Sequence, residues 1–299
     1  MVLSAAPILV TGGSGQLATA LMARAGSRNL VLAGRPDFDF DRLEAIPAFL
    51  RATAPSLIIN AAAYTAVDKS ETDADAAYRA NRDGPRILAE YCAEAGIPLI
   101  HVSTDYVYDG DKGAPYVETD TTNPTGVYGA SKLAGEAAVL ATGARAVILR
   151  TSWVYSATGK NFVLTMLNAA TKTSTLRVVA DQHGCPTAAG DLAAAILRIV
   201  NRFIASGWQD YYRGVYHAAG SGATTWHGLA STVFDEAAKY GRPLPSVTPI
   251  ATADWPTPVR RPPDSRLDCM KLGRVFGVAL PDWRISVART VDEIFVTRK

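Results

Sequence analysis

The sequence is short of cysteine, and it lacks the long apolar runs of membrane proteins. Its 299 residues contain three cysteines, Cys92, Cys185 and Cys269, which are widely spaced and form no C-x-x-C pair. We therefore expect reduced thiols, as in the cytoplasm, rather than a disulfide framework or a zinc site. The first apolar run ends at Val10, and residues 1–7 carry no basic region. We expect no signal peptide and no membrane partner.

Net charge is also small, which argues against a nucleic-acid partner. Thirty Lys and Arg stand against 28 Asp and Glu, a formal charge of +2, and no run of like charges concentrates it. Hydrophobic residues make up 48% of the chain and charged residues 19%, an ordinary globular balance. A chain of this length can bury a large core, in one large domain or two smaller ones.

What the sequence does contain is a regular alternation of strand and helix patterns. Short aliphatic strands are expected at Ile8–Val10, Leu30–Ala33, Leu57–Asn60, Leu99–Ser103 and Ala146–Arg150, with helical segments between them. This order predicts an α/β fold with a Rossmann-like, doubly wound parallel sheet and helices on both faces. The first helix is expected over Gln16–Ala25, with Gly26 as its cap. The alternation loosens after residue 152, where further helices are expected over Asn161–Ala170 and Val287–Val296. We expect a dinucleotide-binding domain over 1–152, to which the chain returns around 185–219, and a smaller, irregular substrate domain mainly over 153–299.

A glycine-rich turn follows the first strand. In Gly12-x-x-Gly15-x-x-Ala18 the glycines let backbone N–H groups approach a diphosphate at the start of a helix, where Gln16 and Leu17 begin. A glycine turn without a ligand is the plain alternative. The position between a strand and a helix favours a nucleotide.

The second strand ends at Gly34-Arg35 instead of at an acidic residue. An arginine suits the 2′-phosphate of NADPH, whereas an acid suits the free ribose of NADH. The following Asp39 and Phe40 are expected to contact the adenosine side, which leaves NADH open as well. After the third strand, the small residues Ala61, Ala62 and Ala63 would leave room for the cofactor.

The strongest catalytic candidate is the pair Tyr128 and Lys132. A spacing of four places both side chains on one face of a helix. A neighbouring ammonium favours the phenolate, so the tyrosine can act as a proton donor near neutral pH. By itself this spacing often occurs by chance on solvated helices.

Taken in order, the segments resemble those of extended short-chain dehydrogenase/reductases, and more narrowly of the dTDP-4-dehydrorhamnose reductase family. The segments are Gly12–Leu17, Asn60–Thr65, Ser103–Tyr106, Tyr128–Lys132, Trp153–Tyr155, Asp181–Thr187 and Arg261–Ser265. The resemblance implies reduction of the C4 keto group of dTDP-4-dehydro-6-deoxy-L-mannose to dTDP-L-rhamnose. It assigns proton donation to Tyr128, a second hydrogen bond to Thr104, and the nicotinamide ribose to Lys132. The implied contacts of the dTDP-sugar are Thr65, Tyr106, Trp153, Gln182 and Arg261.

One departure from the family pattern concerns a metal. Some bacterial members bridge a dimer through Mg²⁺ held by glutamates, but here Ala20 occupies one of those places and only Asp191 is acidic near the other. We expect no Mg²⁺, and a homodimer is left open. Two alternatives remain: another sugar-nucleotide reductase or epimerase, and a non-catalytic regulatory subunit of methionine adenosyltransferase.

Overall fold

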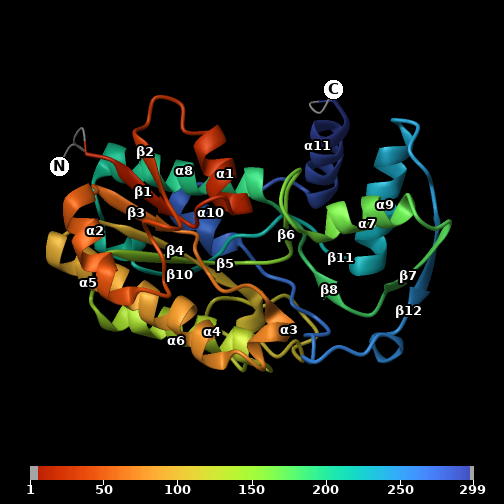
Figure 1. Ribbon diagram of the computed structural model, residues 1–299, viewed down its shortest axis with the longest axis horizontal. Coiled ribbons are helices and arrows are strands. Elements are labelled where there is room, and N and C mark those ends of the chain that lie inside the picture. The colour runs from red at the N-terminus through yellow and green to blue at the C-terminus, as the bar shows by residue number, and fades with distance from the viewer. Residues whose placement is uncertain (1–5, 297–299) are drawn as a thin grey trace.

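The computed structural model describes residues 6–296, and its centre is a sheet of six parallel strands (Figure 1). Their order is β10-β5-β4-β3-β1-β2, and every neighbouring pair is parallel. The bounds are Ile8–Thr11 (β1), Leu30–Ala33 (β2), Leu57–Asn60 (β3), Leu99–Thr104 (β4), Ala146–Thr151 (β5) and Gly214–His217 (β10). The predicted doubly wound sheet is confirmed. The sixth strand, β10, was not predicted.

Helices cover both faces of this sheet. One face carries α1 (Gln16–Ala23), α8 (Ala189–Ser206) and α10 (Met270–Phe276), and the other carries α2 (Ile46–Thr53), α5 (Gly84–Ala95) and α6 (Val127–Ala141) (Figure 1). Successive residues of β1 alternate between the two cores: Ile8 and Val10 join the first, and Leu9 joins the second. Burial on both sides explains why these strands read as continuous aliphatic runs.

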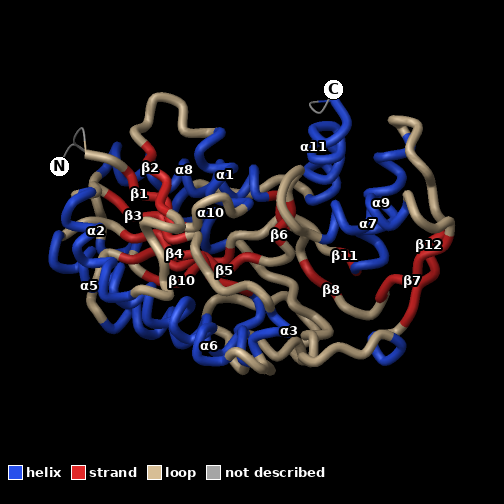
Figure 2. Tube along the Cα trace, in the orientation of Figure 1, coloured by secondary structure: helices blue, strands red, loops and turns tan. Residues whose placement is uncertain are grey.

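A second group of elements lies beyond the carboxyl end of β5. Helices α7 (Phe162–Ala170), α9 (Trp226–Ala238) and α11 (Trp283–Val296) pack around a third core that includes Leu229, Val233 and Val287. Small two-stranded sheets accompany them (Figure 2). These pair β7 (Thr175–Val179) with β12 (Ser246–Ile250), β8 (His183–Gly184) with β11 (Thr224–Thr225), and β6 (Val154–Tyr155) with β9 (Thr187–Ala188).

Shorter elements complete the described chain. These are α3 (Val67–Ser70), α4 (Ala74–Tyr78), a π-helical turn at Arg79–Asp83, and 3₁₀ turns at Leu43–Ala45, Asp105–Val107, Asp210–Tyr212 and Thr252–Asp254. No helix within residues 6–296 combines the length and apolar character needed to cross a bilayer. The expectation about a signal peptide partly concerns residues 1–5, which lie outside the described residues.

Three predicted helix ends are wrong by a few residues. The first helix was expected to run to a cap at Gly26, but α1 ends at Ala23. Asn161 precedes α7 instead of starting it, because its side chain accepts a hydrogen bond from the Leu164 N–H at 3.1 Å and caps the helix. The last helix, expected from Val287, already begins at Trp283.

Candidate active site

The turn between β1 and α1 requires glycine for steric reasons. Gly12 has φ +110°, and a Cβ placed on it would lie 3.0 Å from the carbonyl carbon and oxygen of Ala61. Gly34 packs against Gly13 even more closely, because a Cβ on Gly34 would lie 2.5 Å from the Gly13 Cα. Gly15 caps α1 without a side-chain hydrogen bond, and the first turn contains no acid. The leading N–H groups of α1 are therefore able to bind an anion.

The side chains of Gln16 and Leu17 are already engaged within the protein. Leu17 is buried in the first core. The Gln16 Oε1 accepts hydrogen bonds from Ser156 Oγ and Asn161 Nδ2, each at 2.9 Å. Leu17 could therefore serve a phosphate only through its backbone, and the amide oxygen of Gln16 is already engaged. The Gln16 side chain joins the glycine turn to Asn161, the N-cap residue of α7. No sequence motif predicted this contact.

Arg35 lies on the surface at the end of β2. Its Nε is 2.9 Å from Asp39 Oδ2, and its Nη2 is 2.5 Å from Asp41 Oδ2. Asp41 is shared with Arg79 at 2.8 Å. An anion at Arg35 would therefore compete with two carboxylates. Phe40 is buried against Phe38, with ring centroids 5.2 Å apart, so its side chain belongs to the second core.

The ends of β1 and β3 are joined through Asn60. Its Oδ1 accepts hydrogen bonds from Thr11 Oγ1 at 2.6 Å and from the Ala62 N–H at 3.2 Å. Ala61, Ala62 and Ala63 follow in a half-buried loop. Small side chains thus line the chain next to Gly12, as the sequence predicted.

Helix α6 brings Tyr128 to the carboxyl end of β4. Gly129 makes this approach possible, since a Cβ at that position would lie 2.1 Å from the Tyr106 carbonyl oxygen. The rings of Tyr106 and Tyr128 meet edge to face, with centroids 5.6 Å apart. Lys132 follows one turn later and is almost fully buried.

The electrostatics of the pair differ from the sequence expectation. Burial raises the pKa of Tyr128, and a hydrogen bond with Thr104 opposes that rise. The Asp105 and Tyr106 charges add to the rise of the Tyr128 pKa, while the Lys132 Nζ donates to the Val102 carbonyl at 2.7 Å. Burial lowers the pKa of Lys132 itself to about 8, while Glu136 opposes the shift.

Thr104 is also oriented differently from the expected donor role. Its Oγ1 donates to Asp105 Oδ1 at 3.0 Å and accepts from the Tyr106 N–H at 3.2 Å. Asp105 is buried, with 2% of its surface exposed. Asp105 lies within the segment Ser103–Tyr106, for which the resemblance implied roles of Thr104 and Tyr106 alone.

The expected substrate contacts fall into two groups. Arg261 donates to the Tyr106 hydroxyl at 3.2 Å and to Asp68 Oδ1 at 2.7 Å, and Tyr106 contacts the Tyr128 ring. Trp153 and Gln182 meet through Trp226 instead. The two indole rings stack at 3.5 Å with an interplanar angle of 6°, and Trp226 Nε1 donates to Gln182 Oε1 at 3.0 Å.

Thr65 is exposed in the loop after β3. Neither Asp68 nor Trp226 was found from the sequence, and no motif marks them.

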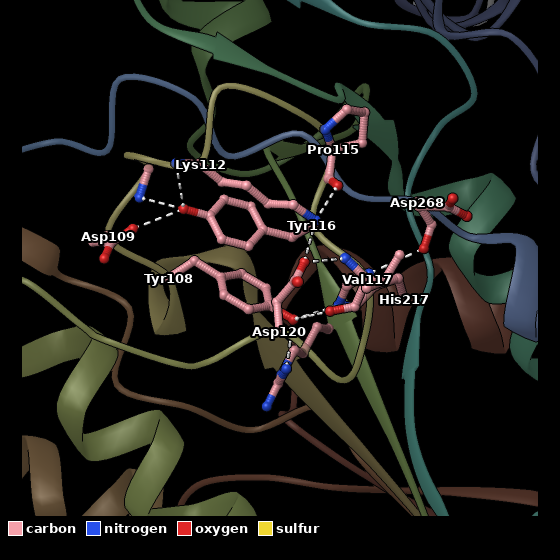
Figure 3. A network of polar contacts seen from close by, with 11 residues as sticks. Tyr108, Asp109, Lys112, Pro115, Tyr116, Val117, Asp120, His217 and Asp268 are labelled. Atoms are coloured by element: carbon pink, nitrogen blue, oxygen red, sulfur yellow. Dashed lines mark hydrogen bonds and ion pairs between the residues drawn. The ribbon is translucent and has the colours of Figure 1, made fainter.

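A buried polar network supports β10 and the loop after β4 (Figure 3). The Tyr108 hydroxyl is 2.8 Å from His217 Nε2, and its ring stacks on Tyr116 with centroids 4.1 Å apart. Arg150 Nη1 donates to the same hydroxyl at 2.6 Å. Burial lowers the pKa of His217 to about 4, so this histidine is neutral near pH 7. The network holds the sixth strand beside the ends of β4 and β5.

The described residues contain no group of three or more His, Cys, Asp or Glu side chains placed to bind a metal. Asp191 is occupied by Arg289 Nη2 at 2.8 Å and by Ser286 Oγ at 2.5 Å. The absence of Mg²⁺ stays a prediction.

Comparison with known proteins agrees with this geometry. The family model described as the RmlD substrate binding domain matches residues 6–296. A dTDP-4-dehydrorhamnose reductase of Sinorhizobium fredii (strain NBRC 101917 / NGR234) is 48% identical over 296 residues, covering 98% of this chain and 99% of that protein.

Two crystal structures of reductases with this name superpose on nearly the whole chain. That from Clostridium acetobutylicum has a TM-score of 0.89 and 33% identity, covering 98% of this chain and 100% of that chain. That from Bacillus anthracis, in complex with NADP, has a TM-score of 0.86 and 31% identity, covering 96% and 99%. The narrower resemblance found in the sequence is confirmed: the chain belongs to the dTDP-4-dehydrorhamnose reductase family.

Proposed function

We propose that this protein reduces the C4 keto group of dTDP-4-dehydro-6-deoxy-L-mannose, which yields dTDP-L-rhamnose, at the expense of NADPH. The observation that carries the proposal is the position of Tyr128 and Lys132, on one face of α6 at the carboxyl end of β4, beside Thr104. Ligands bind at this edge in doubly wound sheets. The names of the relatives support the substrate, and a purely regulatory role would not need these three side chains.

The residues around the glycine turn fit a nicotinamide dinucleotide. Uncapped N–H groups at the start of α1 suit the diphosphate, and the close packing of Gly12 on Ala61 admits backbone but no side chain. Arg35 would hold the 2′-phosphate of NADPH, and Asp39 lies beside it for the adenosine ribose. The NADP bound to the B. anthracis relative supports this choice.

Proton transfer follows from the placement of the phenol. NADPH, when bound, supplies the hydride that attacks C4. As negative charge gathers on the carbonyl oxygen, Tyr128 donates its proton there. Lys132 would hold the ribose hydroxyls. Thr65, Tyr106, Trp153, Gln182 and Arg261 would contact the sugar nucleotide.

Three coarser expectations belong to the same proposal. Residues 1–152, with the segment around 185–219, would form the cofactor-binding part, and most of 153–299 the substrate-binding part. The protein would act in the cytoplasm, and a homodimer is compatible with the departure at Ala20. Size-exclusion chromatography with light scattering tests the oligomeric state.

The test of the function is product identification. Purified protein is incubated with NADPH and the dTDP-4-keto sugar, and the product is analysed by NMR. We expect stoichiometric oxidation of NADPH and a dTDP-6-deoxysugar with the rhamno configuration at C4. Oxidation that yields the other C4 epimer would contradict the assigned product, and no oxidation would contradict the reductase assignment.

A further inference from the structure

The hydroxyl of Thr104 has one proton, and its two possible acceptors are Asp105 and Tyr128. In the structure the hydroxyl donates to Asp105 Oδ1, with 3.0 Å between the two oxygens. A donated hydrogen bond from Thr104 would lower the pKa of Tyr128 as well as that of Asp105. One O–H cannot donate to both at once. The Thr104 hydroxyl therefore donates either inward to Asp105 or outward on the side of Tyr128, where we place the substrate.

The protonation state of Asp105 can decide which of these two hydrogen bonds the Thr104 hydroxyl makes. It is 2% exposed and lies directly after β4, and its second oxygen, Oδ2, has no hydrogen-bond partner within residues 6–296. Burial raises the pKa of Asp105 to about 6. The hydroxyls of Ser265, Thr104 and Ser152 stabilise the ionised carboxyl and so oppose this rise in pKa. An aspartate in this state changes charge near pH 6.

The charge of Asp105 acts on the pKa of three neighbouring titratable groups, two phenols and a thiol, which are Tyr106, Tyr128 and Cys185. All three have raised pKa values, chiefly from burial, and stay neutral between acid and neutral pH. Asp105 is therefore the group in this cluster that titrates there.

We propose that Asp105 is a positioning residue for the reduction: when ionised it holds the Thr104 proton, and when protonated it releases that proton toward the substrate carbonyl. The inference rests on the proposed function. A carboxylate can only accept a hydrogen bond, so it fixes Thr104 as a donor to the interior. A carboxylic acid donates to the Thr104 oxygen, and the threonine O–H then turns outward.

The consequence concerns the charge that develops on the carbonyl oxygen. With Asp105 ionised, Tyr128 is the single donor from this group. With Asp105 protonated, Thr104 joins it as a second donor, and one such donor typically contributes about 100-fold or more to kcat. The contribution of Thr104 should therefore depend on pH, and Asp105 should set that dependence.

The experiment measures kcat of the wild type and of Thr104→Val at a series of pH values around the Asp105 pKa of about 6. The effect of the substitution at each pH is the ratio of the wild-type kcat to the variant kcat. We expect the ratio to be large below that pKa and to fall at least tenfold above it. In an Asp105→Asn background, which cannot titrate, the ratio should no longer change with pH. A ratio that stays constant with pH in the wild-type background would overturn the proposal.

Two further variants separate positioning from a structural role. Ser265→Ala removes a hydroxyl that stabilises the ionised carboxyl, so it should move the pH midpoint of the ratio upward, whereas Ser265→Thr should restore it. An unchanged midpoint in Ser265→Ala would contradict the proposed control.

A second readout needs no substrate, so it distinguishes failure of this inference from failure of the proposed function. The carboxyl stretch of Asp105, identified in the infrared by its absence in Asp105→Asn, should titrate near pH 6. Thr104→Val should raise that midpoint, and Thr104→Ser should leave it near the wild-type value. No rise in Thr104→Val would overturn the inference even for a protein that proved inactive on the keto sugar.

Discussion

Glu136 and Arg150 form a buried ion pair one helical turn beyond Lys132. Arg150 Nη2 lies 2.6 Å from Glu136 Oε2, and both side chains are at most 5% exposed. Ser103 Oγ donates to the same carboxylate at 2.5 Å. The pair fastens α6, which carries Tyr128, to β4 and β5, and its carboxylate opposes the loss of charge on Lys132.

Removing this carboxylate should destabilise the fold. Glu136→Ala leaves the Arg150 guanidinium buried without its partner, which typically costs about 3–5 kcal/mol. Urea denaturation at neutral pH measures the change in the free energy of unfolding. The matched control is Glu90→Ala, which breaks the exposed pair of Glu90 with Arg86 and should cost ~0.5 kcal/mol or less. Similar losses in both variants would contradict the importance of burial here.

Cofactor binding should weaken with rising pH because of Lys132. Its pKa is lowered to about 8, so the ammonium is present below that value and is lost as the pH rises through it. Fluorescence titration with NADPH on either side of about pH 8 should show the affinity falling toward the alkaline side. In Lys132→Arg the side chain stays charged and the pH dependence should disappear. A flat wild-type profile would contradict this assignment.

Arg35 should discriminate between the two nicotinamide cofactors. Arg35→Ala should weaken NADPH by tenfold or more and NADH much less, since a hydrogen bond to a charged group contributes ~1.5–3 kcal/mol. Dissociation constants for both cofactors check this. Arg79→Ala is the control, because Arg79 pairs with the same Asp41. Equal loss for both cofactors in Arg35→Ala would show that Arg35 does not read the 2′-phosphate.

The Trp153–Trp226 stack should affect the sugar nucleotide without affecting the cofactor. Trp226→Ala removes the stacked ring and the donor to Gln182. An aromatic pair contributes ~0.5–1.5 kcal/mol beyond its buried area, so we expect KM for the substrate to rise roughly threefold to tenfold. The NADPH dissociation constant should stay unchanged. Trp208→Phe, in the first core, is the control. A rise in the NADPH dissociation constant alone would contradict the assignment.

Features encoded by local spacing were predictable from the sequence. The glycines of the first turn and the four-residue interval between Tyr128 and Lys132 depend on chain geometry within one or two turns. Five of the six strands were visible as aliphatic runs. Strand β10 was not, because Gly214–His217 begins with glycine and contains a single aliphatic residue, Val215.

Contacts between distant segments could not be predicted in the same way. The hydrogen bond from Ser156 to Gln16 and the pair of Arg261 with Asp68 join residues 140 and 193 positions apart. The Ser152 and Ser265 hydroxyls that lower the pKa of Asp105 also come from segments that meet it only in the packed fold. Likewise, Lys132 was expected to lower the Tyr128 pKa, but its ammonium binds a strand carbonyl.

The central claim is that Tyr128 donates the proton to the C4 oxygen. Its most direct test is the single-turnover rate of NADPH oxidation by Tyr128→Phe with the dTDP-4-keto sugar, together with the NADPH dissociation constant of the variant. We predict a rate about 100-fold or more below wild type with cofactor binding retained, as expected for loss of a general acid. A wild-type rate in this variant would contradict the assignment of Tyr128 as the acid.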